Sequence, residues 1–328
     1  MVCNIYNQSL EKIAALTEFE SLMWEEGYIS AGAFQVVARK SDVTASAFKA
    51  GNFVGVPQLS STLMVIRSVE DKDGQMWAIG SESKTILSNR VHEGTAVCGV
   101  VEKSLKEIIA SQRPFPIVAV EPIKGLTEKR RMQSTYGDLF TISQNWCDAV
   151  GYGFRMVHDR TNKKLMYSVY EGKSTGYKAS ENIGNIANIY RAESENGWKN
   201  VAYVAGAGDG ADRIVVLCGD VNSEGLERRE MYVDARDIQP DGMTDSEYRE
   251  ALTDRGFEKL AESARVEELD FEILGNDYGR LFGLGDKITC VLRGIGVKLE
   301  VKVMTAKTVV EGNQITTTIT VGNPVRRL

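Results

Sequence analysis

A glycine-rich stretch in the second half of the chain constrains the fold more than any other feature. It begins at Tyr203 and reads Tyr-Val-Ala-Gly-Ala-Gly-Asp-Gly-Ala-Asp-Arg-Ile-Val-Val. A phosphate-binding loop needs glycines that lead from a strand into a helix, because the helix N-terminus supplies the amide donors. Here residues 213–217, a β-branched run, directly follow Gly206, Gly208 and Gly210 and resemble a second strand. The stretch therefore predicts a β-hairpin with the glycines in its turn.

Size and composition limit the class of protein. The chain has 328 residues, of which 43% are hydrophobic, enough for two or three domains with real cores. No apolar run approaches the roughly 18–20 residues that span a bilayer, and the N-terminus lacks a basic region followed by an apolar one. We therefore expect no signal peptide and no stable membrane binding. The net charge of −6 argues against a broad nucleic-acid-binding surface.

The cysteines and histidines give no pattern that is typical of metal or redox chemistry. The five cysteines have no short spacing and sit beside apolar residues, which predicts buried free thiols in a reducing compartment. The two histidines, His92 and His158, are too few for a histidine-based metal site or a histidine-assisted nucleophile. We expect no cofactor and no bound metal.

The first half of the chain reads as β-structure followed by an α+β segment. Residues 63–69 and 76–79 flank Asp73-Gly74, a strong signal for a hairpin. Residues 10–19 fit either a strand or a short helix. Helical periodicity indicates one helix from about residue 101 that ends before Pro114, and another over 138–150. Trp146 shares the apolar face of that second helix, so we expect it in the core.

The second half returns to strands, interrupted by one helix. Thr244 and Glu247 form a capping-box pattern at its start, and we expect it to run to about Arg265. It should bury three apolar side chains: Leu252, Phe257 and Leu260. Near the end of the chain, residues 297–303 alternate apolar and charged side chains, and after a turn residues 315–321 alternate with threonines. These are the clearest strand signals in the sequence.

Together these patterns predict an α+β fold that is predominantly β, and they favour four segments. These are an N-terminal β-barrel-like domain (1–94), an α+β domain (95–180), a β-rich segment with the glycine hairpin (181–243), and a helix with the C-terminal β-barrel strands (244–328). The strand pattern of the first segment fits either a barrel or a sandwich, and the barrel form of the first and last segments is what the family resemblance described below implies.

A search for catalytic groups finds only weak candidates. The acid pairs Asp209 with Asp212 and Glu267 with Glu268 could transfer protons or bind a cation, but neither lies in a recognisable cage. An Asp-x-x-Asp in a glycine turn is ordinary turn chemistry. The chain has no Gly-x-Ser-x-Gly elbow, no His-Glu-x-x-His helix and no complete phosphate loop. We therefore expect no enzymatic activity.

Two clusters of charge remain. Lys129-Arg130-Arg131 reads as a solvated loop. Glu227-Arg228-Arg229-Glu230, followed by Asp234-Ala235-Arg236-Asp237, is dense in opposite charges. An arginine pair can bind phosphate or sugar, but alternating signs more often form a local ion-pair network. This second cluster predicts a junction within the fold or between subunits.

The segment from Gly225 to Ile238 resembles a family of tail proteins from long-tailed, siphovirus-type phages and prophages. Other landmarks agree in the same order along nearly the whole chain. They are Trp24-Glu25-Glu26-Gly27-Tyr28 with Gly32-Ala33-Phe34, then Ile86-Leu87-Ser88-Asn89-Arg90, then Leu284-Gly285-Asp286-Lys287-Ile288. The family is similar in architecture to the baseplate hub, or tail-associated protein, at the distal end of the tail tube.

This resemblance implies two β-barrel-like hub domains per subunit, with smaller mixed α/β domains, in a homotrimeric ring. It implies a place in the virion tail, at the baseplate or tail tip, with assembly in the cytoplasm of the host bacterium. The implied partners are the distal tail protein, the tail tube protein, the tape measure protein and a tail fibre or spike, with DNA only in transit. The structural or interface candidates are Gly206, Gly208, Gly210, Arg213, Glu227, Arg228, Arg229, Asp234, Arg236, Gly285 and Asp286.

Two alternatives stay open at this point. One is a tail-associated cell-wall hydrolase, although such proteins usually carry an extra catalytic domain. The other is a carbohydrate-binding host-recognition module, for which exposed, clustered aromatic side chains are expected. The tyrosines and tryptophans here are mostly interleaved with apolar residues, which favours the structural role.

Overall fold

A computed structural model describes residues 1–111, 116–208, 210, 213–263, 266–275, 277–293 and 297–322. Within these residues the chain divides into a first unit, Met1–Asn188 with Phe271–Gly322, and a second unit, Ile189–Asp270. The sequence-based division into four segments stays a prediction. None of the helices in the described ranges is long and apolar enough to cross a membrane.

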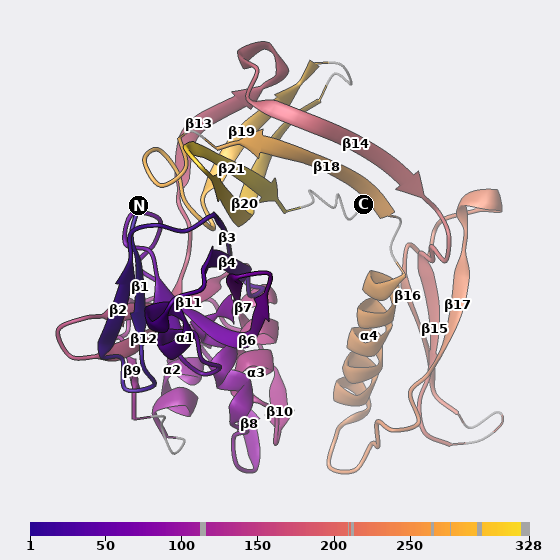
Figure 1. The fold of residues 1–328 in the computed structure, drawn as a ribbon. Coiled ribbons are helices and arrows are strands. Elements are labelled where there is room, and N and C mark those ends of the chain that lie inside the picture. The colour runs from indigo at the N-terminus through magenta and orange to yellow at the C-terminus, as the bar shows by residue number, and fades with distance from the viewer. Residues whose placement is uncertain are drawn as a thin grey trace. The chain divides into compact units, whose positions relative to one another are not determined.

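The first unit contains most of one extensive sheet (Figure 1), whose strands β14 and β18 continue into the second unit. Its main path runs β18-β21-β20-β3-β4-β7-β6-β5-β1-β2, with β14 beyond β18, and β19 pairs with both β20 and β13. The strands are β1 (Cys3–Tyr6), β2 (Lys12–Leu16), β3 (Ser21–Gly27), β4 (Ala33–Arg39), β5 (Phe53–Gly55), β6 (Met64–Lys72), β7 (Gln75–Glu82), β13 (Ser174–Ser180), β14 (Ile186–Ser194), β18 (Val266–Leu274), β19 (Lys287–Leu292), β20 (Val297–Glu311) and β21 (Gln314–Val321). Residues 10–19, which the sequence left open, therefore contain a strand.

The pairing of β3 with β20 joins the two ends of the sequence. Ser21–Gly27 runs antiparallel to Thr305–Glu311, residue by residue, so the N-terminal strands and the last strands belong to one sheet. Figure 1 shows these dark and yellow strands side by side. Backbone pairing therefore joins the N-terminal strands directly to the C-terminal strands.

Local turn chemistry explains the hairpins at the predicted places. The β6–β7 turn has Asp73 at φ 53° and Gly74 at φ 77°, the left-handed values that a tight hairpin turn requires. The β20–β21 turn has Gly312 at φ 57°. The predicted hairpins are confirmed, and β20 is longer than expected because it continues past residue 303 to pair with β3.

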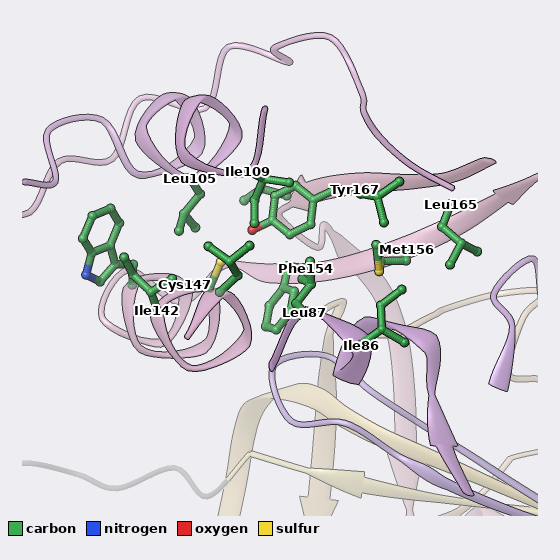
Figure 2. Packing of buried hydrophobic residues seen from close by; sticks show 14 of the residues in the cluster. Ile86, Leu87, Leu105, Ile109, Ile142, Cys147, Phe154, Met156, Leu165 and Tyr167 are labelled. Carbon is green, nitrogen blue, oxygen red and sulfur yellow. The ribbon is translucent and has the colours of Figure 1, made fainter. Parts of the chain in front are cut away.

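A smaller layered part of the first unit lies in the sequence between the N-terminal strands of that sheet and its later strands. Strands β9 (Val118–Val120), β11 (Gly153–Asp159) and β12 (Lys164–Tyr170) form a sheet against helices α2 (Val101–Ser111) and α3 (Leu139–Asp148). Figure 2 shows side chains from both helices and both long strands meeting in its core. Trp146 is buried there, as predicted. The remaining short elements of this unit are α1 (Asp42–Ala47), η1 (Ser83–Asn89), β8 (Thr95–Val97), β10 (Gln133–Thr135) and η2 (Glu181–Ile183).

The second unit packs one helix against three strands. Strand β15 (Val201–Ala205) lies between β16 (Val215–Gly219) and β17 (Glu230–Asp234), and α4 (Asp245–Glu262) covers one face. A short turn, η4 (Gly225–Glu227), precedes β17. The capping box between Thr244 and Glu247 is present, so the predicted start of the helix is confirmed.

The prediction that α4 buries Phe257 is wrong. Leu252 is fully buried and Leu260 is partly buried, but Phe257 is 53% exposed. Phe257 lies five residues after Leu252, which places it about 140° around the helix from the buried face.

All five cysteines are free and buried, as expected from their apolar neighbours. Of the candidate acid pairs, Asp209 and Asp212 lie outside the described residues, and the side chains of Glu267 and Glu268 are likewise outside them.

Candidate functional site

The glycine stretch is a β-hairpin, as the sequence predicts. Residues 201–205 and 215–219 pair antiparallel, and Gly208 and Gly210 have φ of 99° and 59°. Gly206 is closely covered, since a Cβ there would lie 2.2 Å from Oη of Tyr248 on α4. The Tyr248 hydroxyl accepts a hydrogen bond from N of Ala207 (2.7 Å). Helix α4 therefore packs over the glycine turn. The strand that follows this turn in the chain is β16.

Arg213 binds the end of this hairpin. Its guanidinium N–H groups donate hydrogen bonds to other residues of the second unit. Its Nε donates to the carbonyl of Gly206 (2.7 Å) and its Nη2 to the carbonyl of Ala205 (3.0 Å). Nη2 also lies 2.9 Å from Oδ1 of Asp234, and Nη1 donates to the hydroxyl of Tyr232 (2.7 Å). A guanidinium with these partners stabilises the hairpin against β17 and has little capacity left for a phosphate.

Asp234 is shared by two arginines. Besides Arg213, it receives hydrogen bonds from Nε and Nη2 of Arg236, at 2.9 Å and 2.6 Å to Oδ2. The hydrogen bonds from Arg236, and after them the one from Arg213, lower the pKa of Asp234 from 3.8 to about 2. The carboxylate is therefore ionised at neutral pH and well into the acid range.

We expect Arg236→Gln to raise the pKa of Asp234 toward its ordinary value of 3.8, because the strongest donors to the carboxylate are lost. A lowered pKa stabilises the folded state above the unfolded pKa, and this contribution is lost as the pH falls through about 2. The measurement is an NMR titration of the Asp234 carboxyl carbon. Arg249→Gln, which removes the partner of Asp245 instead, is the control. Unchanged titration near 2 in the Arg236 variant would contradict the assignment.

The other charges of the cluster are also paired, with one exception. Arg228 binds Glu230 (2.6 Å), which also accepts from the hydroxyl of Tyr203. Arg229 binds Glu195 (2.5 Å) and lies 4.7 Å from the ring of Trp198. The exception is Glu227, which is exposed and forms no ion pair within the described part of the chain.

These ion pairs border an uncovered face of the three-stranded sheet. Tyr203 pairs with Leu217 on one side and Tyr232 on the other. The three side chains are 37%, 41% and 60% exposed, on the face opposite the buried Val204. Large apolar side chains that stand together in solvent are typical of an interaction surface. We call Tyr203, Leu217 and Tyr232 the open face.

Gly285 and Asp286 lie in the first unit, before β19. Gly285 has φ 83° and donates to the carbonyl of Val303 (2.8 Å). The carboxylate of Asp286 accepts from N of Lys173 and from N of Gly283, both at 2.9 Å. Asp286 thus joins the connector before β13 to the turn before β19. These are contacts within the unit, and an interface role for the two residues stays a prediction.

The ring of Tyr28 fills the space beside Gly285. Tyr28 is fully buried, and its hydroxyl lies 3.1 Å from the carbonyl of Gly151 and 3.2 Å from that of Tyr170. A Cβ on Gly153, or on Gly285, would lie 2.2 Å from Cε2 of Tyr28. The end of β3, the start of β11 and the turn before β19 therefore meet at one ring, which we call the Tyr28 junction.

A buried ion pair lies next to this junction. Lys84 and Glu82 are almost completely buried, with Nζ 3.3 Å from Oε2. Lys84 also donates to the carbonyls of Gly27 (2.5 Å) and Phe154 (3.3 Å), while Glu82 accepts from N of Gly27 and N of Gly32. Burial raises the pKa of Glu82, and the ammonium of Lys84 opposes that rise.

Sequence reasoning missed this ion pair and the Tyr28 junction as a site. Tyr28 and Gly285 appear only in separate motifs of the resemblance. Glu82 and Lys84 belong to a polar run at the end of a strand, and such a run looks solvated. No local signal marks their burial, because the backbone groups that enclose them, at Gly27, Gly32 and Phe154, are fifty or more residues away. In the described part of the chain, no three His, Cys, Asp or Glu side chains gather in a way that could hold a metal ion.

Comparison with solved structures reveals the same fold in tail proteins. The tail protein of Neisseria meningitidis MC58 matches with TM-score 0.60 and 13% identity, over 98% of this chain and 96% of that one. The 43 kDa tail protein of prophage MuSo2 from Shewanella oneidensis matches with TM-score 0.60 and 12% identity, over 95% of each chain. A prophage tail protein from Listeria monocytogenes EGD-e gives 0.60 and 11%, over 99% and 95%. A search of curated proteins found no match.

The fold is thus that of phage and prophage tail proteins. Residues 94–323 match the model of one family, so the chain belongs to the Siphovirus ReqiPepy6 Gp37-like proteins. The predicted membership in a siphovirus-type tail protein family is confirmed, and the molecule is predominantly β as expected.

Proposed function

We propose that this protein is the hub of a phage tail tip, a non-enzymatic homotrimer that connects the tail tube and distal tail protein to the tip. Its N-terminal and C-terminal β-modules serve as two barrel-like hub domains per subunit. Three subunits then present six similar modules to a six-fold tube. Tape measure protein and a tail fibre or spike are the further partners, and DNA passes only in transit.

The observation that carries this proposal is the pairing of β3 with β20. A subunit that must present two tube-like modules at a set spacing needs them joined rigidly, and seven consecutive residue pairs provide that connection. The Tyr28 junction and the Lys84–Glu82 pair stabilise the same region from within. The net charge of −6 also supports a hub, because an acidic channel wall repels DNA in transit.

The open face and its ion pairs supply a surface for contact between subunits. Ring closure requires an obligate interface, on the order of 2,000 Å² or more. Exposed Tyr203, Leu217 and Tyr232, bordered by the Arg213–Asp234 and Arg228–Glu230 pairs, fit an apolar centre with a polar rim.

Mass photometry and light scattering of the purified chain test the proposal. We expect a species of three times 36.2 kDa, about 109 kDa. Leu217→Glu should weaken it, whereas Phe257→Glu, an exposed side chain on α4, should leave it intact. Monomer at tens of micromolar would contradict self-assembly. If the protein forms a trimer that Leu217→Glu does not affect, the open face is not the contact between subunits, and the proposed hub role still stands. Clearing of host cell walls in a zymogram would instead favour a hydrolase.

A further inference from the structure

A polar cavity of about 320 Å³ lies inside the first unit, next to the Tyr28 junction. Its walls come from segments that are far apart in the sequence: the end of β3, Ser60 to Thr62, the strands β7, β11 and β12, and the turn before β19. The lining side chains that matter here are Glu26, Glu82, Arg155, Tyr170 and Tyr278. This volume corresponds to about ten water molecules, or to one small ring-shaped ligand.

The carboxylates of the cavity use only half of their acceptors within the described residues. Glu26 receives hydrogen bonds from Ser60 (2.6 Å) and Thr62 (2.7 Å), both at Oε1. Glu82 receives its hydrogen bonds at Oε2. Both residues are more than nine-tenths buried, at 7% and 2% exposed. The second oxygen of each carboxylate is therefore left for a donor that the described residues do not supply.

Arg155, in contrast, has a hydrogen-bond donor that lacks an acceptor among the described residues. Its guanidinium lies on the ring of Tyr170, with Cζ 4.6 Å from the centroid, and its Nε is buried without an acceptor among the described residues. Tyr278 also lines the cavity and adds a hydroxyl group. Burial, and then the charge of Glu26, raise the pKa of that hydroxyl, so it keeps its proton.

Acidic and basic groups are equal in number around the cavity. Glu26 and Glu82 are the two acidic groups, and the two basic groups are Arg155 and Lys84, whose Nζ lies 3.3 Å from Glu82. The site therefore calls for neither a cation nor an anion. What the described residues leave unsatisfied is hydrogen bonding, with acceptors at the carboxylates and a buried donor, Nε, at Arg155.

We propose that this cavity binds a neutral, hydroxyl-rich ring, the chemistry of a monosaccharide unit. Hydroxyl groups both donate and accept, so one ring can satisfy the free oxygens of Glu26 and Glu82 and the guanidinium of Arg155 together. The ring of Tyr278, which lines the cavity, packs against a C–H face of the sugar. The site is separate from the open face and does not depend on trimer formation.

Saturation-transfer NMR on the full chain tests this with glucose, galactose, mannose, rhamnose and N-acetylglucosamine. We expect binding of at least one sugar, weakened about tenfold by Arg155→Met and by Tyr278→Phe, which remove the donors and keep the stem or ring. Arg160→Met, an exposed arginine that does not line this cavity, is the matched control and should bind as the wild type does.

Absence of binding for all five sugars would overturn the proposal, as would binding that neither cavity variant weakens. Calorimetry with CaCl₂ provides a further check. Heat of binding that Glu26→Gln removes, without sugar binding, would assign the cavity to a cation instead. Circular dichroism shows whether each cavity variant folds. If either Arg155→Met or Tyr278→Phe folds poorly, the other variant still tests whether the cavity binds the sugar.

Discussion

Gly285→Ala should lower the free energy of unfolding of the first unit by about 3 kcal/mol. Two costs add. Gly285 has φ 83°, where an L-residue is strained, and its new Cβ would lie 2.2 Å from Cε2 of Tyr28. The ring has little freedom to move aside, because Gly153 also lies close against it and its hydroxyl is held by the carbonyls of Gly151 and Tyr170. Urea unfolding followed by circular dichroism measures the loss.

Gly279→Ala is the matched control for this substitution. Gly279 has nearly the same φ, 78°, but a Cβ there would meet no atom within 4 Å. It should lose only the backbone cost, about 1 kcal/mol. The difference between the two variants isolates the steric contribution of the Tyr28 junction. Equal losses would mean that the ring does not restrict this position.

Lys84→Met should destabilise the same unit by roughly 3–5 kcal/mol, since it leaves the Glu82 carboxylate buried without its cation. It also frees the carbonyls of Gly27 and Phe154, which Lys84 binds from two different strands. Unfolding midpoints in urea give the size of the loss. Lys103→Met is the control, because Lys103 and Glu107 are 59% and 63% exposed and their pair contributes little.

The pH dependence of the Lys84 variant distinguishes charge from packing. Without the ammonium, the pKa of Glu82 is raised further above its ordinary 4.5 in the folded state. A raised carboxyl pKa favours folding below the unfolded pKa, and this contribution disappears as the pH rises through the folded pKa. The variant should therefore approach wild-type stability near pH 4 and fall behind at pH 7. A pH-independent loss would indicate packing alone, and Glu82→Gln with Lys84→Met should restore part of the stability.

The local features of this chain were predictable because their causes are local. Asp73-Gly74 makes a hairpin through its own backbone angles, and Thr244 with Glu247 starts a helix through bonds three residues apart. The glycine stretch was assigned to a hairpin because a β-branched run follows it. Helical spacing placed Trp146 in the core, whereas the same reasoning failed for Phe257, whose position around the helix lies outside the buried face.

The sequence by itself thus determined the family, the predominance of strands, and the turns, caps and core faces that depend on near neighbours. Only the tertiary structure decided which charges are buried. Glu82 and Lys84 look like solvated charges beside a strand, yet their partners at Gly27, Gly32 and Phe154 enclose them. The polar cavity likewise unites residues from Glu26 to Tyr278. Burial depends on which distant strands pair and pack, and the pairing of β3 with β20 spans nearly the whole chain.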